Sequence, residues 1–357
     1  MSILTAEQHV LGHPDGDIIA RGSRQTMPEV KPRISLIISN FNGKDTTDRC
    51  VQSVVQYTAY PQERLRILVV DDGSVDGSVS VLRQRFDGKI ELLEMNQNVG
   101  FIKANNAAIT YALESHQPDY VMLLNNDTEA VQPDWLARLV ETAERCGERM
   151  GIICPQLIFP DGRVQWSGRP RERNTIALIL QTVTARLNPG FATKDSAKHE
   201  VIEVNTASGA CMLIKSALIR RIGLLDVSLA PAFQEDVEYS FRTWRAGFNV
   251  LYRPDIKVVH HERVSFEGRR NPEAAKNKKY WTVRNSMLVC FKYFGIGRTL
   301  AFGLPIFAIQ ALFDPKNKRK KLGITNIALA GNPIASLATL WISGLDAFRI
   351  YQSEKLV

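Results

Sequence analysis

The chain has 357 residues, of which 45% are apolar and 23% are charged, and its 45 Lys and Arg against 37 Asp and Glu give a formal net charge of +8. These proportions are those of a folded globular protein and exclude a disordered or collagen-like chain. The length suits one large domain with an appendage, or two domains. Excess positive charge favours nucleic acid, anionic lipid or a phosphorylated substrate as a partner, so its position in the chain matters.

The five cysteines include no C-x-x-C pair, and most have apolar neighbours. We therefore expect buried free thiols in a reducing compartment, and neither a disulfide framework nor a zinc site. Residues 1–31 are mixed in polarity and lack the unbroken apolar segment of a secretory signal. They are predicted to form an N-terminal arm or an added strand.

Between residues 33 and 146, short β-branched apolar runs alternate with segments of helical spacing. Strands are predicted at 33–39, 65–70, 90–94 and 120–124, and helices at 45–57, 78–86, 100–114 and 135–146. This alternation predicts a parallel α/β sheet with right-handed crossovers. Ligands bind at the carboxyl ends of strands in such sheets, and three of these four strands run into polar, acidic or Asn-rich loops.

The pattern changes after residue 151. Short strands are predicted at 152–155, 157–159, 250–253 and 257–260, and helices at 215–222 and 234–246. Residues 169–198 are basic and polar, which predicts a long excursion that is mobile or covers a substrate. The second half therefore predicts a mixed sheet with an irregular insertion.

Two of the strand-end loops carry carboxylates suited to ligands. Asp71 and Asp72 can accept hydrogen bonds from a nucleobase or a ribose, although the same residues also occur in ordinary turns. Asp127, preceded by two asparagines, suits a hard divalent cation that takes its remaining ligands from a diphosphate, or a simple turn before a helix.

Two further pairs lie in the second half. Glu235 and Asp236 open a predicted helix, where acidic residues also act as caps. As a functional pair, one of them would remove a proton from an acceptor hydroxyl, and we favour Asp236. His260 and His261 follow a predicted strand and can ligate a metal or bond a phosphate, or can be purely structural.

Taken in order, six segments resemble family 2 glycosyltransferases, and within them the bacterial rhamnosyltransferase-like members. The segments are 37–43, 69–76, 96–101, 123–127, 208–212 and 235–242, and the resemblance extends from about residue 32 to 265. It implies an α/β GT-A fold, a Rossmann-like nucleotide-binding mixed sheet flanked by helices, here with a C-terminal α-helical extension. It also implies a nucleoside-diphosphate-sugar donor, a divalent metal (Mn²⁺ or Mg²⁺) and inversion at the anomeric carbon.

By position, the resemblance implies roles for individual residues. Donor binding would involve Asn40, Phe41, Asp71, Asp72, Gly100, Lys103, Asn126 and Asp127. Asp127 and His260 would hold the metal, although Asn125 stands where the family has the first acidic residue of its Asp-x-Asp motif. Asp236 would be the catalytic base, beside Glu235. The acceptor side would include Trp166, Arg169, Ser208 and Gly209.

Three regions are expected. They are an arm (1–31), a GT-A domain (32–268, with a nucleotide-sugar-binding half at 32–130 and an acceptor and catalytic half at 131–268) and a C-terminal region (269–357). Residues 269–321 carry 13 Lys and Arg against two acidic residues, so the basic excess belongs to this tail. Its apolar stretches predict helices on an anionic membrane surface, or else a basic extension packed on the core. Residues 324–345 are long enough to span a bilayer but include two asparagines and a proline.

These features predict an inverting, metal-dependent glycosyltransferase at the cytoplasmic face of the inner membrane. It would move a sugar from dTDP-rhamnose or a UDP-sugar to a lipid-linked or polymeric glycan in cell-surface polysaccharide synthesis. A sugar-nucleotide nucleotidyltransferase would need a Gly-rich phosphate loop after the first strand, which residues 39–43 do not form. A nucleic-acid-binding protein would need a known motif in the basic tail, and an inactive scaffold would lack Asp127 and Asp236.

Overall fold

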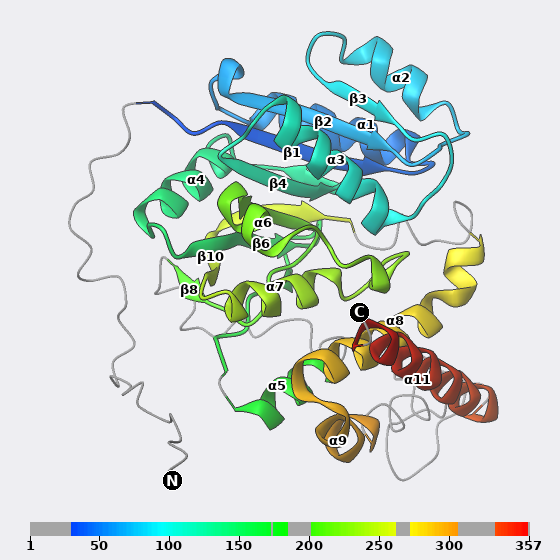
Figure 1. Cartoon of the computed structure of the whole chain (residues 1–357). Helices are drawn as coiled ribbons and strands as arrows, with labels where there is room; N and C mark the ends of the chain where they lie inside the picture. The colour runs from blue at the N-terminus through cyan, green and yellow to red at the C-terminus, as the bar shows by residue number, and fades with distance from the viewer. Residues whose placement is uncertain (1–29, 173, 185–200, 262–271, 306–332, 356–357) are drawn as a thin grey trace.

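The structure is a computed structural model that describes residues 30–172, 174–184, 201–261, 272–305 and 333–355 (Figure 1). Most of the predicted N-terminal arm, much of the basic excursion and the cluster of five basic residues at 316–321 lie outside the described residues. Of the apolar stretch at 324–345, residues 333–345 are described.

One mixed sheet organises the chain, in the order β3-β2-β1-β4-β9-β6-β10-β5, with β7 paired to β6 and β8 to β10. Its first four strands are β1 (Ile34–Asn40), β2 (Leu65–Asp71), β3 (Glu91–Glu94) and β4 (Tyr120–Asn125). They are all parallel, as predicted. The others are β5 (Thr128–Ala130), β6 (Met150–Ile158), β7 (Val164–Trp166), β8 (Ile202–Glu203), β9 (Cys211–Lys215) and β10 (Asn249–His260).

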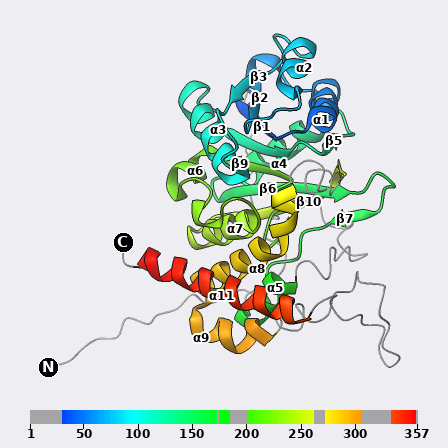
Figure 2. The same ribbon diagram turned by 90° about the vertical axis from the view of Figure 1, so that its right-hand side faces the viewer.

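Helices cover both faces of the sheet (Figures 1 and 2). They are α1 (Lys44–Tyr57), α2 (Ser78–Arg85), α3 (Phe101–Ser115), α4 (Trp135–Arg145), α5 (Thr175–Thr184), α6 (Ser216–Ile222) and α7 (Glu235–Arg245), with short 3₁₀ turns η1 (Gln62–Arg64) and η3 (Val227–Leu229). Alternate residues of β1 serve different faces: Leu36 and Ile38 pack with α1, α2 and α4, while Ile37 packs with α3, α6 and α7. Such a strand is buried on both faces, which explains its continuous apolar sequence.

Two predicted strand pairs are single strands. Residues predicted as 152–155 and 157–159 form β6, and those predicted as 250–253 and 257–260 form β10. Between Arg253 and Lys257, the pairing of β10 with β6 shifts in register. The residues between them form a bulge, after which the strand continues. A break in the apolar pattern therefore marked a bulge.

All five cysteines are free thiols, and four of them are buried, as the sequence predicted for most of them. Cys146 is only half-buried. Burial raises the pKa of Cys50, Cys154 and Cys290 to about 12, so these thiols stay protonated and serve as small apolar groups in the core.

The C-terminal region contributes α8 (Pro272–Phe294), α9 (Ile296–Arg298), a π-helical turn η4 (Thr299–Gly303) and α11 (Pro333–Lys355). Leu288 and Phe291 of α8 are buried in the same core as β1, α3 and α7. In turn, α11 packs on α8, where Phe348 and Tyr351 contact Phe291 with ring centroids 6.3 and 5.9 Å apart. Residues on both sides of position 268 thus share one core, while the division into functional domains stays a prediction.

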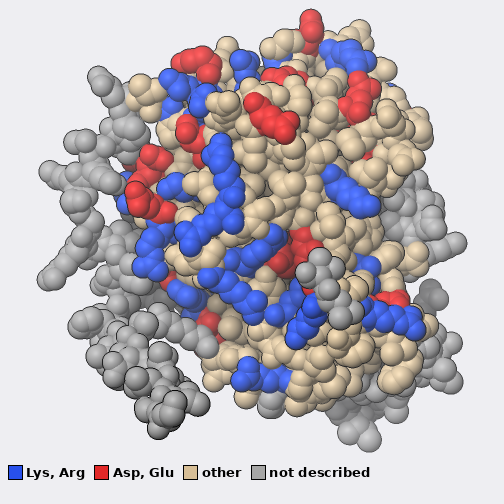
Figure 3. All heavy atoms as spheres, viewed as in Figure 1, with Lys and Arg blue, Asp and Glu red and all other residues tan. Residues whose placement is uncertain are grey.

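Within the described ranges, no helix is both long and apolar enough to cross a bilayer. Figure 3 shows Lys and Arg side chains gathered across the middle of one face, with Asp and Glu side chains among them. Helices α6 and α7 carry such residues in their last turns, namely Arg220, Arg221, Arg242 and Arg245. Cations there are favoured by the negative end of the helix dipole, so not all of the surface positive charge belongs to the tail.

Candidate active site

The predicted site residues that follow β1 and β2 form a closed hydrogen-bond network. Asn40 Nδ2 donates to Asp71 Oδ1 at 2.6 Å and to Ser78 Oγ at 2.9 Å. The second carboxylate oxygen of Asp71 accepts the backbone N–H of Ser74 at 2.9 Å. Asn40 and Asp71 are almost fully buried, at 1% and 2% exposure. A role of Asp71 in nucleobase binding thus stays a prediction that would use the remaining lone pairs of an already bonded carboxylate.

Asp72 ties the end of β2 to the loop before α3. Its two oxygens accept the backbone N–H groups of Val99 at 2.7 Å and Gly100 at 3.0 Å. Burial raises the pKa of Asp72, and these two hydrogen bonds oppose the rise. Gly100 has a φ of +90°, a left-handed conformation that glycine adopts without strain. Lys103 lies exposed on the first turn of α3.

Asn126 belongs to the same network. Its amide donates to Thr47 Oγ1 at 2.8 Å, and Thr47 donates to Asn40 Oδ1 at 2.6 Å. A Cβ at Gly43 would lie 2.4 Å from the Asn126 amide nitrogen, so only glycine fits where the loop after β1 crosses Asn126. Phe41, in that loop, is half-buried. An open hollow of ≈420 Å³ adjoins the network, and Asp71, Ser74, Arg83, Glu94 and Asn96 are among the residues that line it.

Asp127 and His260 lie together, as predicted from the resemblance. His260 Nε2 is 3.2 Å from Asp127 Oδ1, and the Asp127 side chain is buried. This contact is not aligned as a hydrogen bond, and among the described residues no group donates a hydrogen bond to Asp127 Oδ1. The pairing of β10 with β5 sets His260 opposite Thr128 and so brings these two distant residues together.

A residue that the sequence analysis missed, Gln165, sets the orientation of His260. Gln165 Oε1 lies 2.7 Å from His260 Nδ1, and Gln165 Nε2 donates to the His260 carbonyl at 3.2 Å. Because an amide oxygen only accepts, Nδ1 carries the proton, and Nε2 of a neutral His260 directs its lone pair at Asp127. A cation between two such acceptors removes their repulsion, so Asp127 and His260 fit a divalent metal with Gln165 as its outer support.

Asp127 and His260 are the ligands that the described residues offer at this point. In the part of the chain that the structure describes, no group of three or more His, Cys, Asp or Glu could hold a metal ion. The other histidine, His261, pairs instead with Glu129, at 2.8 Å from Nε2 to Oε1. A metal held by Asp127 and His260 would therefore take its remaining ligands from a diphosphate and water.

Glu235 and Asp236 open α7 after an unusual turn. Phe233 and Gln234, immediately before the helix, have φ values of +80° and +69°. Non-glycine residues in this region cost about 1–3 kcal/mol each, and they persist where surrounding contacts hold them. Asp236 accepts the backbone N–H of Gly209 at 2.9 Å and of Val237 at 2.8 Å, whereas Glu235 Oε2 has no hydrogen-bond partner among the described residues.

Burial raises the pKa of both carboxyls, but their hydrogen bonds differ. Burial, followed by the adjacent charge of Asp236, raises the pKa of Glu235 from 4.5 to about 8. Burial also raises the pKa of Asp236, but the hydrogen bonds from the N–H groups of Gly209 and Val237 favour its charged form. The hydrogen bonds to Asp236 thus favour its carboxylate form, whereas Glu235 Oε2 has no such partner among the described residues.

The Asp127–His260 pair and the acidic pair, Glu235 and Asp236, lie at the same edge of the sheet. Asn125 N–H donates to the Ala210 carbonyl at 2.9 Å, one residue from the Gly209 N–H that Asp236 accepts. Antiparallel pairing of β4 with β9 brings these segments together. The link could not be read from sequence, because the two segments are more than eighty residues apart.

The four residues predicted for the acceptor side are spread over two segments. Trp166 ends β7 and packs edge-on against Tyr252, with ring centroids 5.5 Å apart, so part of its ring serves the core. Arg169 is half-buried, which lowers the pKa of its guanidinium. Gly209 contacts Asp236, and its neighbour Ser208 precedes β9. Acceptor contacts of these residues stay predictions.

Comparison with known proteins gives the site a family. A model of "Glycosyl transferase family 2" matches residues 35–223, more than half of the chain. RfbC of Myxococcus xanthus, an O-antigen biosynthesis protein, is 24% identical over 255 residues, 70% of this chain and 18% of that protein. The N-acetylglucosaminyl-diphospho-decaprenol L-rhamnosyltransferase of Mycobacterium tuberculosis is 28% identical over 214 residues, 56% of this chain and 67% of that enzyme.

The protein y4gI of Sinorhizobium fredii is 25% identical over 248 residues. These residues make up 69% of this chain and 26% of y4gI, so the chain spans about a quarter or less of two of its relatives. Among solved structures, PcManGT, a mannosyltransferase from Pyrobaculum calidifontis in complex with GDP-Man and Mn²⁺, matches with a TM-score of 0.51 at 15% identity. The match covers 92% of this chain and 89% of that one.

GalNAc-T7, crystallised with UDP, GalNAc and Mn²⁺, matches with a TM-score of 0.52 at 19% identity, over 73% of this chain and 48% of that one. Identities this low establish the fold alone. They confirm the predicted α/β fold with its mixed sheet and C-terminal helices. On the match of its family model, the chain belongs to glycosyltransferase family 2.

Proposed function

We propose that this chain is an inverting, metal-dependent glycosyltransferase that moves a sugar from a nucleoside-diphosphate sugar to a hydroxyl of a glycan acceptor. The observation that carries the proposal is the placement of Asp236. Its carboxylate is held by the Gly209 and Val237 N–H groups at the sheet edge that also holds the Asp127–His260 pair. A base and a metal site at one edge are what a single displacement requires.

In this proposal Asp236 takes the proton of the acceptor hydroxyl as its oxygen bonds to the anomeric carbon. The bond from that carbon to the diphosphate breaks at the same time, its electron pair leaves with the diphosphate, and attack from the opposite side inverts the configuration. Asp236 suits this task better than Glu235, because the Gly209 and Val237 N–H groups fix its carboxylate and favour its charged form, whereas Glu235 Oε2 has no hydrogen-bond partner among the described residues.

Asp127 and His260 would hold the metal through Asp127 Oδ1 and His260 Nε2, with Gln165 keeping the His260 proton on Nδ1. A bound divalent cation would neutralise the charge that develops on the leaving diphosphate. An imidazole ligand favours Mn²⁺ over Mg²⁺, which prefers oxygen ligands. The Mn²⁺ in two solved structures of this fold supports that preference.

For the donor we propose a deoxythymidine or uridine diphosphate sugar bound along the carboxyl ends of β1 and β2, beside the hollow lined by Asp71 and Ser74. The similarity to an L-rhamnosyltransferase supports rhamnose as the sugar. The similarity to that enzyme and to an O-antigen biosynthesis protein supports a lipid-linked or polymeric glycan as the acceptor, in cell-surface polysaccharide synthesis.

We further propose that α11 rests on the anionic cytoplasmic face of the inner membrane. Trp341 and Ile342 are 71% and 52% exposed, and Leu345 and Phe348 continue the apolar surface at helical spacing. Replacing Trp341, Ile342 and Leu345 with serine should reduce flotation on liposomes rich in anionic lipid and leave donor turnover in solution unchanged. Flotation equal to that of the wild type, or binding to DNA or RNA in its place, would refute this assignment.

The central proposal is tested with a panel of donors. dTDP-rhamnose, UDP-glucose, UDP-N-acetylglucosamine and GDP-mannose are each incubated with the protein and Mn²⁺, and release of nucleoside diphosphate is measured with and without EDTA. We expect metal-dependent release from one donor, with dTDP-rhamnose the first candidate, and retention of nucleotide-diphosphate binding by Asp236→Asn. If no donor in the panel is turned over, or if EDTA has no effect on turnover, the proposal fails in this form.

A further inference from the structure

The loop from Asp226 to Gln234 leads into the acidic pair, and the C-terminal helix α8 holds it from behind. Sequence composition assigned α8 to a basic tail. Its side chains nevertheless make several of the polar contacts that determine where this loop lies.

Asn285 makes the most concentrated of these contacts. Its Nδ2 lies 2.6 Å from the Leu229 carbonyl oxygen, 2.9 Å from that of Ala232 and 2.8 Å from that of Phe233. The side chain is fully buried, and Arg284 Nε donates to its Oδ1 at 2.8 Å, which fixes the orientation of the amide. Three carbonyls thus share the two N–H groups of one side chain.

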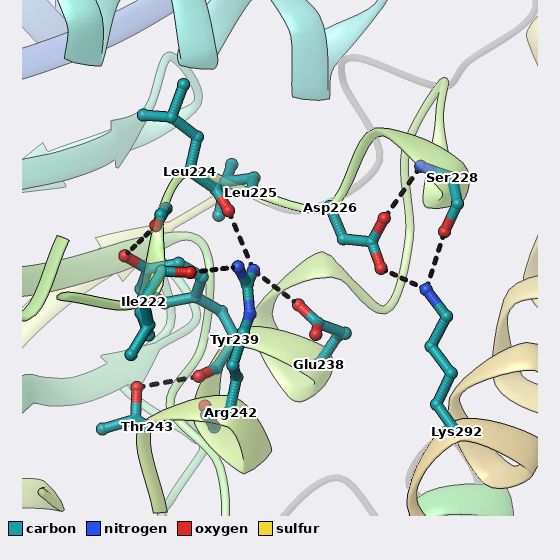
Figure 4. Close-up of polar contacts among 12 residues, drawn as sticks. Ile222, Leu224, Leu225, Asp226, Ser228, Glu238, Tyr239, Arg242, Thr243 and Lys292 are labelled. Carbon is teal, nitrogen blue, oxygen red and sulfur yellow. Dashed lines mark hydrogen bonds and ion pairs between the residues drawn. The ribbon is translucent and has the colours of Figure 1, made fainter. Parts of the chain in front are cut away.

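Two cationic side chains of α8, Arg284 and Lys292, extend these contacts along the loop. Arg284 donates to the carbonyls of Ser228 at 2.9 Å and Ala230 at 2.8 Å. Figure 4 shows Lys292 reaching from α8 to Asp226 and Ser228. On the other side, Arg242 of α7 donates to the carbonyls that precede the loop (Figure 4).

The geometry that Asn285 holds is one that the chain does not adopt by itself. Phe233, whose carbonyl it binds, and Gln234 both have positive φ, and α7 begins at the next residue. Since Asp236 lies in the first turn of α7, a shift of Phe233 moves Asp236 relative to Gly209. The loop also touches the donor side, because the Ile102 N–H donates to the Pro231 carbonyl at 3.2 Å.

We propose that Asn285 is a positioning residue for the transfer reaction: its amide holds the turn at Phe233 so that Asp236 meets the acceptor hydroxyl. This inference rests on the proposed function of Asp236, and it makes α8 part of the catalytic unit. Asn285 acts through the loop and touches no substrate.

Asn285→Asp is the sharpest variant. It keeps the size and shape of the side chain but directs an oxygen at three carbonyl oxygens, so the loop must move. We expect turnover to fall by about 100-fold, the loss that a displacement of roughly 1 Å produces at a reacting group. KM for the donor should change less than turnover does, because the loop meets the donor side through a backbone hydrogen bond, from Ile102 to Pro231, and Asn285 itself lies outside the donor-side network.

Cys290→Ala is the matched control. Cys290 is also fully buried on α8, but its thiol forms no hydrogen bond with the loop at residues 226–234. Its replacement therefore measures destabilisation of the helix alone. Both variants should lower the unfolding temperature, and only Asn285→Asp should lower turnover below the folded fraction. Equal turnover in the two variants, scaled to folded protein, overturns the proposal.

Hydrogen–deuterium exchange of peptides covering residues 226–240 supplies a readout independent of activity. Asn285→Asp should speed exchange there, while Cys290→Ala and peptides of β1 and α1 should not differ from the wild type. If the wild type turns over no donor, the proposed function fails and the exchange experiment still decides whether Asn285 holds the loop. Unchanged exchange at 226–240 in Asn285→Asp sinks the positioning role.

Discussion

The two groups of candidate site residues are built in opposite ways. At the ends of β1 and β2, Asn40, Asp71 and Asp72 donate or accept hydrogen bonds on every polar side-chain atom. At the ends of β4 and β10 and the start of α7, Asp127 and Glu235 each retain a buried oxygen with no hydrogen-bond partner among the described residues. A bonded network stabilises a loop, whereas an unpaired buried acceptor costs about 1–3 kcal/mol until a ligand supplies its partner.

This difference separates residues that shape the site from residues that act on ligands. We infer that the network around Asn40 forms the wall of the nucleotide site before any donor arrives. The open oxygen of Asp127 is where a metal and its diphosphate would complete the structure, and the acceptor hydroxyl would meet Asp236, beside the open oxygen of Glu235. Substitutions in the two groups should therefore change different measured quantities.

The largest effect should come from Asp236→Asn, which removes the base. We expect transfer to fall by about 10²–10⁴-fold, the usual contribution of a general base, with binding of nucleoside diphosphate and Mn²⁺ retained by calorimetry. Glu235→Gln is the comparison and should lose less. If Glu235→Gln is the more damaged of the two, the base has been assigned to the wrong carboxyl.

The proposed metal site at Asp127 and His260 offers the next effect, because the chain has two adjacent histidines with different partners. His260→Gln should weaken Mn²⁺ binding by at least about 10–100-fold, the loss expected for removal of even an outer partner of a metal site. His261→Gln, which removes only the contact with Glu129, should bind Mn²⁺ as the wild type does. Titration of Mn²⁺ in the presence of nucleoside diphosphate measures both, and equal losses in the two variants would contradict the assignment.

A substitution in the bonded network should lower stability more directly than it lowers metal affinity. Asn40→Ala leaves the buried oxygens of Asp71 and Ser78 without their donor, so we expect the free energy of unfolding to drop by about 1–3 kcal/mol. Urea denaturation measures the loss, and Asn98→Ala, at an exposed position, provides the control. A variant of Asn40 as stable as that control would show that the network does not hold the loop.

Glu235 should also give the protein a pH dependence of stability. Glu235 has a higher pKa in the folded protein, about 8, than its ordinary value of 4.5. The folded state therefore binds more protons, and this contribution to stability is complete below pH 4.5 and is lost as the pH rises towards 8. Glu235→Gln removes this titration. Between pH 5 and pH 9, the unfolding temperature of the wild type should therefore fall relative to that of the variant. Parallel curves for the two proteins would exclude a raised pKa.

Much of the fold was predictable because its signals are local. Strands β1, β2 and β4 are short apolar runs that are largely buried, β3 is a half-buried run at the end of the sheet, and each helix between them has one apolar face. The four strands and four helices predicted between residues 33 and 146 therefore match within a residue or two, whereas the short β5 was not predicted. The continuity of β6 and of β10 was not predicted, since a bulge such as that in β10 and a chain break look alike in sequence.

The sequence by itself determined the α/β class, the family resemblance and the identity of the acidic and histidine residues, because these depend on residue type and order. Only the tertiary structure decided which of them meet: strand pairing put His260 beside Asp127 and sent His261 to Glu129. It also showed that α8, which composition assigned to a basic tail, holds the loop before Asp236 through Asn285. The physical reason is that hydrogen bonds between segments distant in sequence depend on packing, and no local pattern records them.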